Sequence, residues 1–293
     1  MSLKYWFLAM RPKTLSAGSM PVVIAGSIAY YYGKFNWFLF IIILICSILI
    51  QVLTNYINEI YDFKKGADTE ERLGPKRMVA SGLISLKQMS IASTIIAFVI
   101  FALGMILVYH SDWIILAIGL LSLFFAYIYT GGPFPLAYLG IGDIFVLFFF
   151  GIIATGGTFY ILTGNYNLVV FIASLAPGFL SMNLLGVNNI RDIETDIKAG
   201  KMTLAVRLGR KKANYLFIIL LLGTYIVPFA IGHFTQSLYN LLPILTFPFG
   251  IKICKDAVNN QGKDLIKVLE NTGKLLLIYG FSTSIGFIIA KNF

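Results

Sequence analysis

The chain has 293 residues, of which 58% are hydrophobic and only 12% are charged, about half the charged share of an ordinary soluble domain. This composition excludes a water-soluble globular protein of this length, and it excludes intrinsic disorder, which needs the opposite bias. Unbroken apolar runs such as Ile41–Ile50 and Ile144–Ile153 favour membrane-spanning helices over barrel strands, in which apolar and polar residues alternate. We therefore expect an all-α integral membrane protein with one polytopic domain over residues 1–293.

Nine segments are apolar enough over roughly 20 residues to cross a bilayer. In chain order they cover residues 14–32, 37–57, 88–109, 113–129, 140–163, 166–190, 213–233, 237–253 and 272–290. The polar stretches between them are too short to form a separate soluble domain. The pattern predicts a bundle of about nine transmembrane helices around a central cavity.

The formal net charge of +10 is distributed unevenly along the chain. Of the 23 Lys and Arg residues, 21 fall in the N-terminal segment or in the loops after the second, sixth and eighth spans, and nine crossings place all four segments on one side. Only Lys34 and Lys291 fall on the other side. Because Lys and Arg concentrate on the cytoplasmic side of membrane proteins, we expect a cytoplasmic N-terminus and a location in the inner cell membrane. The charge then reflects topology, and no nucleic-acid partner is expected.

Two of the basic loops are also acidic, which membrane topology does not require. Asn58 and Asp62 stand four residues apart at the end of the second span, and Asp192 and Asp196 have the same separation after the sixth. Residues four apart lie on one face of a helix. Carboxylate and amide oxygens suit Mg²⁺, which keeps waters and substrate phosphates in its shell. The residues thus predict two acidic clusters that bind Mg²⁺ and a diphosphate at the cytoplasmic face.

Each cluster is followed by the pattern Asp-x-Lys-x-Gly, at Asp62–Gly66 and again at Asp196–Gly200, which indicates a faint internal repeat. Basic side chains near the clusters suit the remaining phosphate charge. They are Arg72, Lys76, Arg77, Arg191, Lys201 and Arg207.

With these motifs the chain resembles the UbiA superfamily of intramembrane prenyltransferases, and within it the 1,4-dihydroxy-2-naphthoate polyprenyltransferases of menaquinone synthesis. The resemblance covers nearly the whole chain, including Arg11–Leu15, Gly74–Arg77 and Tyr129–Pro135. Its most specific part is the long run Asn188–Gly209. One departure is that the family usually has Asn-Asp where this chain has Asn58 followed by Glu59, which leaves the role of the glutamate open.

The resemblance implies a Mg²⁺-dependent transfer of a polyprenyl group from its diphosphate to a small aromatic acid, within the lipid bilayer. In the naphthoate case CO₂ and diphosphate are lost and demethylmenaquinol is formed. The metal ligands carried over are Asn58, Asp62, Asp68, Asp192 and Asp196. The substrate-binding residues carried over are Lys13, Arg72, Lys76, Arg77, Asn188, Arg191, Lys201 and Arg207. Asp62, Asp192 and Tyr129 are the expected catalytic residues, since a tyrosine ring face can stabilise an allylic cation.

Two alternatives stay open at this point. Another acceptor, such as 4-hydroxybenzoate, would use the same diphosphate motifs. A transporter would place its ionisable residues near the middle of the membrane, whereas the acids of this chain lie at the ends of the spans.

Overall fold

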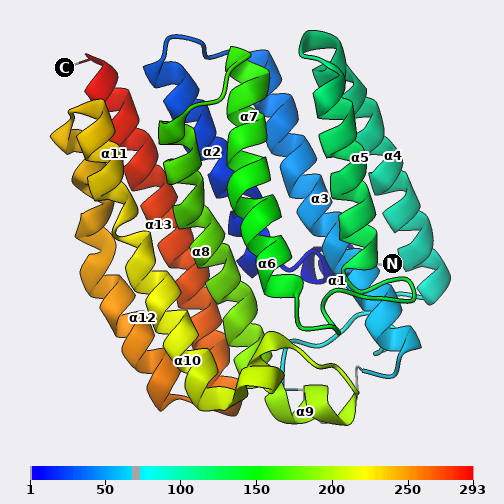
Figure 1. Cartoon of the computed structure of the whole chain (residues 1–293). Coiled ribbons are helices and arrows are strands. Elements are labelled where there is room, and N and C mark those ends of the chain that lie inside the picture. The colour runs from blue at the N-terminus through cyan, green and yellow to red at the C-terminus, as the bar shows by residue number, and fades with distance from the viewer. Residues whose placement is uncertain (1, 68–72, 293) are drawn as a thin grey trace.

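The computed structural model describes residues 2–67 and 73–292, and every regular element in these ranges is a helix (Figure 1). The all-α prediction is therefore confirmed. The elements are α1 (Leu3–Ala9), η1 (Pro12–Thr14), α2 (Leu15–Tyr31), α3 (Trp37–Lys64), α4 (Leu86–His110), α5 (Trp113–Ile128), α6 (Gly142–Val146), η2 (Leu147–Ile153), α7 (Ala154–Thr163), α8 (Leu168–Arg191), α9 (Ile193–Lys198), α10 (Leu204–Thr224), α11 (Val227–Thr235), η3 (Leu238–Thr246), α12 (Phe247–Asn259), η4 (Gly262–Asp264) and α13 (Leu265–Asn292).

Polar side chains set the points at which the long helices begin. The Asn36 side chain accepts a hydrogen bond from the Leu39 N–H at 3.1 Å and starts α3, and Asn167 does the same for α8. Ser85 starts α4 with a capping box closed by Gln88. These caps satisfy N–H groups that the first helical turn leaves without a partner.

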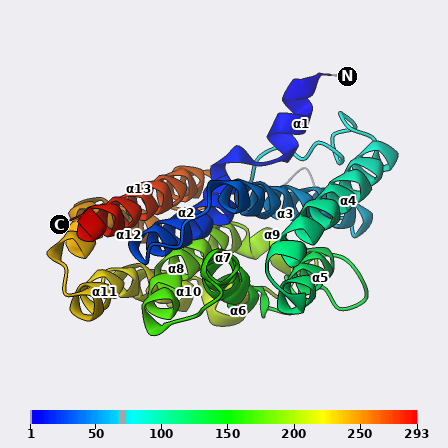
Figure 2. The same ribbon diagram turned by 90° about the horizontal axis from the view of Figure 1, so that it is seen from above.

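The long helices run side by side and form two facing rows. Viewed from above, α13, α2, α3 and α4 follow one another along one side of the bundle, and α11, α8, α7 and α5 lie along the other (Figure 2). Contacts of α8 with α2 and α13 join the rows at one end of the bundle. The larger cavity described below lies between the rows and is lined by α2, α3, α4, α5, η2, α7 and α8.

Six helical segments are long and apolar enough to cross a membrane within the described residues. They are Trp37–Lys64, Leu86–His110, Gly142–Thr163, Leu168–Arg191, Leu204–Thr235 and Gly262–Asn292. The other three predicted spans also coincide with helices, but these are shorter or interrupted. α2 has 17 residues, α5 has 16, and the eighth range falls on η3 and α12.

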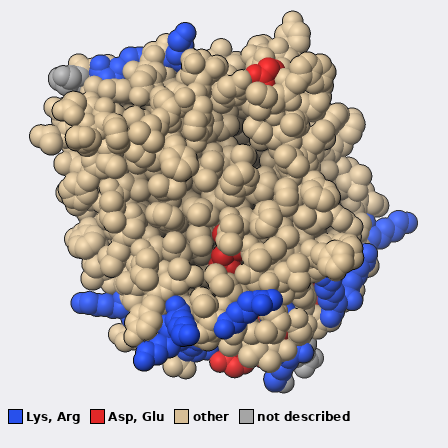
Figure 3. Space-filling view, in the orientation of Figure 1, with Lys and Arg blue, Asp and Glu red and all other residues tan. Residues whose placement is uncertain are grey.

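The outer surface has the character of a membrane protein. Large apolar side chains face outward along α4, where Ile95 is 57% and Phe98 71% exposed. Lys and Arg side chains gather at the lower edge of the molecule, and a broad band with few charges lies above them (Figure 3). A multi-pass membrane protein follows from this surface and from the spanning helices.

Candidate functional site

The ends of α3 and α8 bring the two predicted clusters to one cavity of about 80 Å³. Asn58 and Asp62 line it from α3, and Asn188 and Asp192 line it from the end of α8. The four-residue separation places each amide one turn deeper in the bundle than its carboxylate. Side chains that are 130 residues apart in the chain therefore line the same cavity. The sequence spacing alone could show only that each pair lies on one face of its own helix.

Asp62 is held by groups from two other segments. Its Oδ2 accepts from Arg77 Nη2 at 2.8 Å, and its Oδ1 accepts from the Tyr138 hydroxyl at 3.0 Å. The same guanidinium donates through Nη1 to Glu59 Oε1 at 3.3 Å, and Glu59 Oε2 accepts from the Val79 N–H at 3.1 Å. Glu59 thus fixes Arg77 and the backbone after it, and it does not line the cavity.

Asp192 is held locally instead. Both of its oxygens accept from the neighbouring Arg191, at 2.8 Å from Nε and 2.6 Å from Nη2. Arg191 is only 1% exposed, and its Nη1 has no hydrogen-bond partner among the described residues. A buried guanidinium nitrogen without an acceptor is suited to an anionic ligand.

Two lysines meet over the ring of Tyr138. Lys65 Nζ lies 4.2 Å and Lys201 Nζ 5.6 Å from the ring centroid, and Lys65 also donates to the Thr130 carbonyl oxygen at 3.0 Å. Partial burial lowers the pKa of Lys65; the Asp62 carboxylate opposes this shift and the Lys201 ammonium adds to it. Two cations close together beside the carboxylates are an arrangement that a diphosphate would stabilise.

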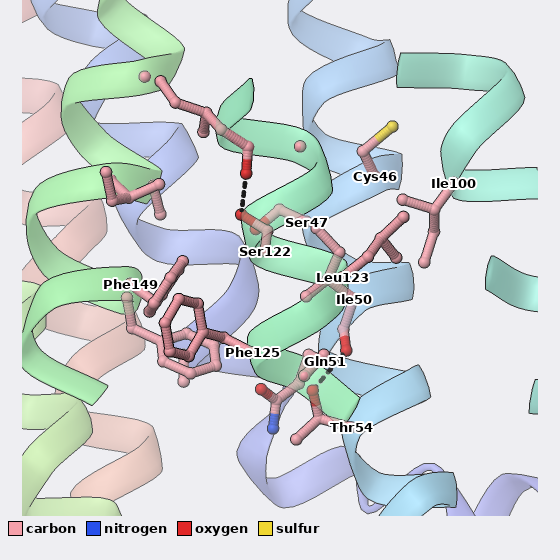
Figure 4. A pocket seen from close by; sticks show the side chains of 18 of the residues that line it. Cys46, Ser47, Ile50, Gln51, Thr54, Ile100, Ser122, Leu123, Phe125 and Phe149 are labelled. Carbon is pink, nitrogen blue, oxygen red and sulfur yellow. Dashed lines mark hydrogen bonds between the residues drawn. The ribbon is translucent and has the colours of Figure 1, made fainter. Parts of the chain in front are cut away.

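A second, larger cavity of about 290 Å³ adjoins the first and extends from it toward the middle of the bundle. Its walls are mostly apolar, and Phe125 and Phe149 face it from opposite helices with their ring centroids 5.0 Å apart (Figure 4). The two cavities share a wall made of five residues, Arg11, Asn58, Tyr129, Leu185 and Asn188. Tyr129 therefore lies where a charged head group would meet an apolar tail.

The predicted site residues divide by position. Those that line the 80 Å³ cavity are Asn58, Asp62, Arg77, Tyr129, Asn188, Arg191, Asp192 and Lys201. Asp196 lies beside it, with Oδ1 3.7 Å from Lys201 Nζ. Lys13 pairs with Glu270 and Lys76 is exposed, both away from the cavity. Asp68 and Arg72 lie outside the described residues.

Arg207 is exposed and does not line the cavity, because its side chain lies against the backbone of Met202 and Gly140. Its Nε donates to the Met202 carbonyl oxygen at 3.2 Å, and it packs on Gly140. A Cβ at Gly140 would lie 2.6 Å from that Nε, and the φ of +73° is one that only glycine adopts readily. Arg207 therefore fastens the loop before α6 to the start of α10.

The donor set fits Mg²⁺ bound partly by substrate. Within the described residues no group of three His, Cys, Asp or Glu side chains is close enough to hold a metal by itself. Three aspartates and three asparagines nevertheless line one small cavity beside cationic groups, among them Asp62 and Asp192 of the two clusters. Mg²⁺ usually binds through one or two carboxylates plus phosphate oxygens and water, so Asp62 and Asp192 are suitable ligands.

One residue that contacts the site was not predicted from the sequence: Tyr138 contacts Asp62 from a loop. Arg11 and Asp143 were candidates that the sequence left between a functional and a structural role. Arg11 reaches the shared wall from a left-handed backbone with φ +53°, and the buried Asp143 lines the smaller cavity. The signals available were weak: a non-glycine residue before a proline, and an acid at the start of a span. Each became informative only when the fold placed it beside the two clusters.

Comparisons with known proteins give a consistent family match. A family model described as the UbiA prenyltransferase family matches residues 19–264. A Haemophilus influenzae protein named 1,4-dihydroxy-2-naphthoate octaprenyltransferase is 35% identical over 98% of this chain and 96% of its own length. The Escherichia coli protein of the same name is 31% identical over 98% and 96%.

Solved structures share the fold. The apo structure of a UbiA homolog from Aeropyrum pernix K1 has a TM-score of 0.71 at 17% identity, covering 94% of this chain and 97% of that one. A UbiA homolog from Archaeoglobus fulgidus, solved with DMAPP and Mg²⁺, has a TM-score of 0.62 at 16% identity, with 96% and 99% covered.

Proposed function

Because the chain belongs to the UbiA prenyltransferase family, we propose that it transfers a polyprenyl group from a polyprenyl diphosphate to 1,4-dihydroxy-2-naphthoate, with Mg²⁺ as cofactor. The name shared by the bacterial relatives supports naphthoate as the acceptor. The structural observation that supports it best is the wall shared by a charged and an apolar cavity. One cavity fits the diphosphate, and the other fits the hydrocarbon chain and the ring.

The reaction balances without an oxidant or an added base. The allylic carbon–oxygen bond of the donor breaks, and its electron pair leaves with the diphosphate. The allylic cation then forms a carbon–carbon bond with the ring carbon that carries the carboxylate. The bond between the ring carbon and the carboxylate then breaks. CO₂ leaves, the electron pair of the broken bond returns to the ring, and demethylmenaquinol is formed.

The charged cavity serves the leaving group. Asp62 and Asp192, with Asn58 and Asn188, would hold Mg²⁺, which when bound neutralises the departing diphosphate. Arg191 Nη1 and Lys201 provide cationic donors for the remaining phosphate oxygens. Arg77 is already paired with two carboxylates, and its role is to hold Asp62 in position.

The apolar cavity serves the cation and the chain. Phe125, Phe149 and Tyr129 present aromatic rings near the shared wall, where the cation forms. The surrounding side chains exclude water, which would otherwise capture the cation. The naphthoate ring then enters this cavity within reach of the allylic carbon.

We further propose nine membrane crossings, with the N-terminus and the active site on the cytoplasmic side of the inner membrane. The basic band lies along one edge of the molecule (Figure 3), and the lysines and arginines of the charged cavity come from the predicted cytoplasmic segments. Arg11 reaches the charged cavity from just before the first crossing, so the N-terminal segment lies on the same side.

The test is a transfer assay on the purified protein in nanodiscs. Mg²⁺ and a polyprenyl diphosphate are supplied with dihydroxynaphthoate or 4-hydroxybenzoate, and the prenylated product is identified by mass. We expect a naphthoate product that has lost its carboxylate, and no product after metal removal with EDTA. A product from hydroxybenzoate alone would reject the acceptor, and no product from either with folded protein would reject prenyl transfer.

A further inference from the structure

Two polar side chains with atoms that have no hydrogen-bond partner line the larger, mostly apolar cavity, one from α3 and one from α8. Gln51 of α3 is 7% exposed and Ser181 of α8 is 2% exposed, and both line the cavity. Gln51 Oε1 and Ser181 Oγ have no hydrogen-bond partner among the described residues. A buried polar atom without a partner is costly, so a native protein usually retains one for a ligand or a water molecule.

A hydrogen-bond relay fixes the orientation of the Gln51 amide. The Thr14 hydroxyl donates its single proton to the Arg11 carbonyl oxygen at 3.0 Å, so Thr14 Oγ1 can only accept from Gln51. It accepts from Nε2 at 3.4 Å, which leaves Oε1 on the side of the cavity. The close-up shows the Gln51 side chain pointing from α3 into the cavity near Phe125 (Figure 4).

Three other hydroxyls of the cavity differ from this pair. Thr54, Ser122 and Thr158 each donate to a carbonyl oxygen one turn earlier in their own helix, at 2.9, 2.8 and 2.6 Å. Their protons are therefore already used within the helix. Gln51 Oε1 and Ser181 Oγ, by contrast, are buried in the cavity wall without a partner among the described residues, so both keep their hydrogen-bonding capacity for a ligand.

The pair lies at one depth relative to the charged cavity. Gln51 precedes Asn58 by seven residues and Asp62 by eleven, and Ser181 precedes Asn188 and Asp192 by the same intervals. Seven helical residues rise by about 10 Å, so both side chains lie two turns deeper in the bundle than the amides of the shared wall. An aromatic ring next to the allylic carbon, on the side away from the charged cavity, would lie at this depth.

We propose that Gln51 Oε1 and Ser181 Oγ bind the ring hydroxyl groups of the aromatic acceptor and thereby orient its reacting carbon toward the allylic carbon. This inference rests on the proposed function. The polyprenyl chain is a hydrocarbon without donors, so the ring is the substrate that matches these atoms. A ring hydroxyl donates to Gln51, which can only accept at Oε1, and Ser181 can donate to or accept from the second hydroxyl.

The test compares Gln51→Leu and Ser181→Ala with Ser122→Ala, a control hydroxyl in the same cavity. Binding of dihydroxynaphthoate is measured by its own fluorescence in nanodiscs, and KM is measured for both substrates. We expect acceptor affinity to fall roughly tenfold or more in Gln51→Leu and Ser181→Ala, with the KM for the polyprenyl diphosphate unchanged. Ser122→Ala should resemble the wild type. Gln51→Met, which keeps the chain length, guards against misfolding of the leucine variant.

Naphthoates that lack one of the two hydroxyls complete the test. The wild type should bind at least one of these analogues as weakly as one of the variants binds dihydroxynaphthoate. That variant should bind the same analogue with no further loss of affinity. Unchanged acceptor affinity in both variants would overturn the inference, as would an equal loss for the acceptor and every analogue. If the wild type transfers only to hydroxybenzoate, the naphthoate proposal fails while the same comparison, made with that ring hydroxyl, still decides the role of the pair.

Discussion

Glu59 is the residue whose role the sequence left open, and the structure assigns it to holding Arg77. Replacing Glu59 with Ala removes one of two carboxylate partners of a guanidinium that is 7% exposed. It also leaves the buried Val79 N–H without its acceptor. Breaking a buried ion pair costs about 3–5 kcal/mol and an unsatisfied N–H about 1–3 kcal/mol. Because Asp62 still pairs with Arg77, we expect a combined loss of about 4 kcal/mol.

Thermal unfolding of the purified variant measures this loss. About 4 kcal/mol corresponds to a fall in Tm of roughly 10 °C for a chain of this size. Glu270→Ala is the matched control, because its pair with Lys13 is solvent-exposed and such pairs contribute about 0–1 kcal/mol. The Mg²⁺ concentration that gives half-maximal transfer should stay unchanged in Glu59→Ala, since Glu59 does not line the cavity. A variant as stable as the control, with an altered Mg²⁺ requirement, would show instead that Glu59 is a ligand.

Three other changes test the remaining parts of the site. Asp62→Asn and Asp192→Asn should each lower kcat by roughly 100-fold or more at saturating Mg²⁺ while the protein stays folded. Lys34→Ala is the control and should leave turnover unchanged. Near-normal turnover in either aspartate variant would remove the metal assignment. Tyr138→Phe deletes only the hydroxyl that donates to Asp62, and a rise in the KM for the polyprenyl diphosphate of roughly tenfold, without a change in acceptor KM, is expected. Gly157 lines the apolar cavity with open space beside it. Gly157→Leu should therefore shift the preference from a long to a short polyprenyl diphosphate by roughly tenfold in competition assays. An unchanged preference would place the polyprenyl chain elsewhere.

The sequence was most informative where a local pattern decides the outcome. Apolar runs located the helices, but they ended too early where a helix continues into polar solvent. The second range stops at residue 57 whereas α3 continues to Lys64, and the last begins at residue 272 whereas α13 begins at Leu265. Similarly, Thr203 caps a short first part of α10, and non-helical backbone at Gly209 separates it from the rest, so the predicted start at residue 213 lies close to the uninterrupted part of the helix. Hydropathy marks the apolar part of a helix and not its hydrogen-bonded ends.

The sequence was least informative where tertiary contacts choose among similar residues. Arg77 and Arg207 looked equivalent as phosphate-binding candidates. The fold buries the first between Asp62 and Glu59 and holds the second against Met202. Lys13 likewise pairs with Glu270, at a sequence separation of 257 residues that no local pattern can reveal. Charge and spacing could therefore predict the kind of site, but only the packing shows which cations remain available to a ligand.

The repeated spacing on α3 and α8 orders the chemistry along the bundle axis. Each helix presents a carboxylate, an amide four residues earlier and an uncommitted polar atom seven residues before that. Because helical rise converts these intervals into depth, the backbone fixes the separation between the carboxylates and the two uncommitted polar atoms, and side-chain rotation alters it little. The two halves are not equivalent in their partners, however, since Asp62 is held by distant residues and Asp192 by its neighbour Arg191. One carboxylate is thus held by contacts from two distant segments, and the other by the buried residue that precedes it in the chain.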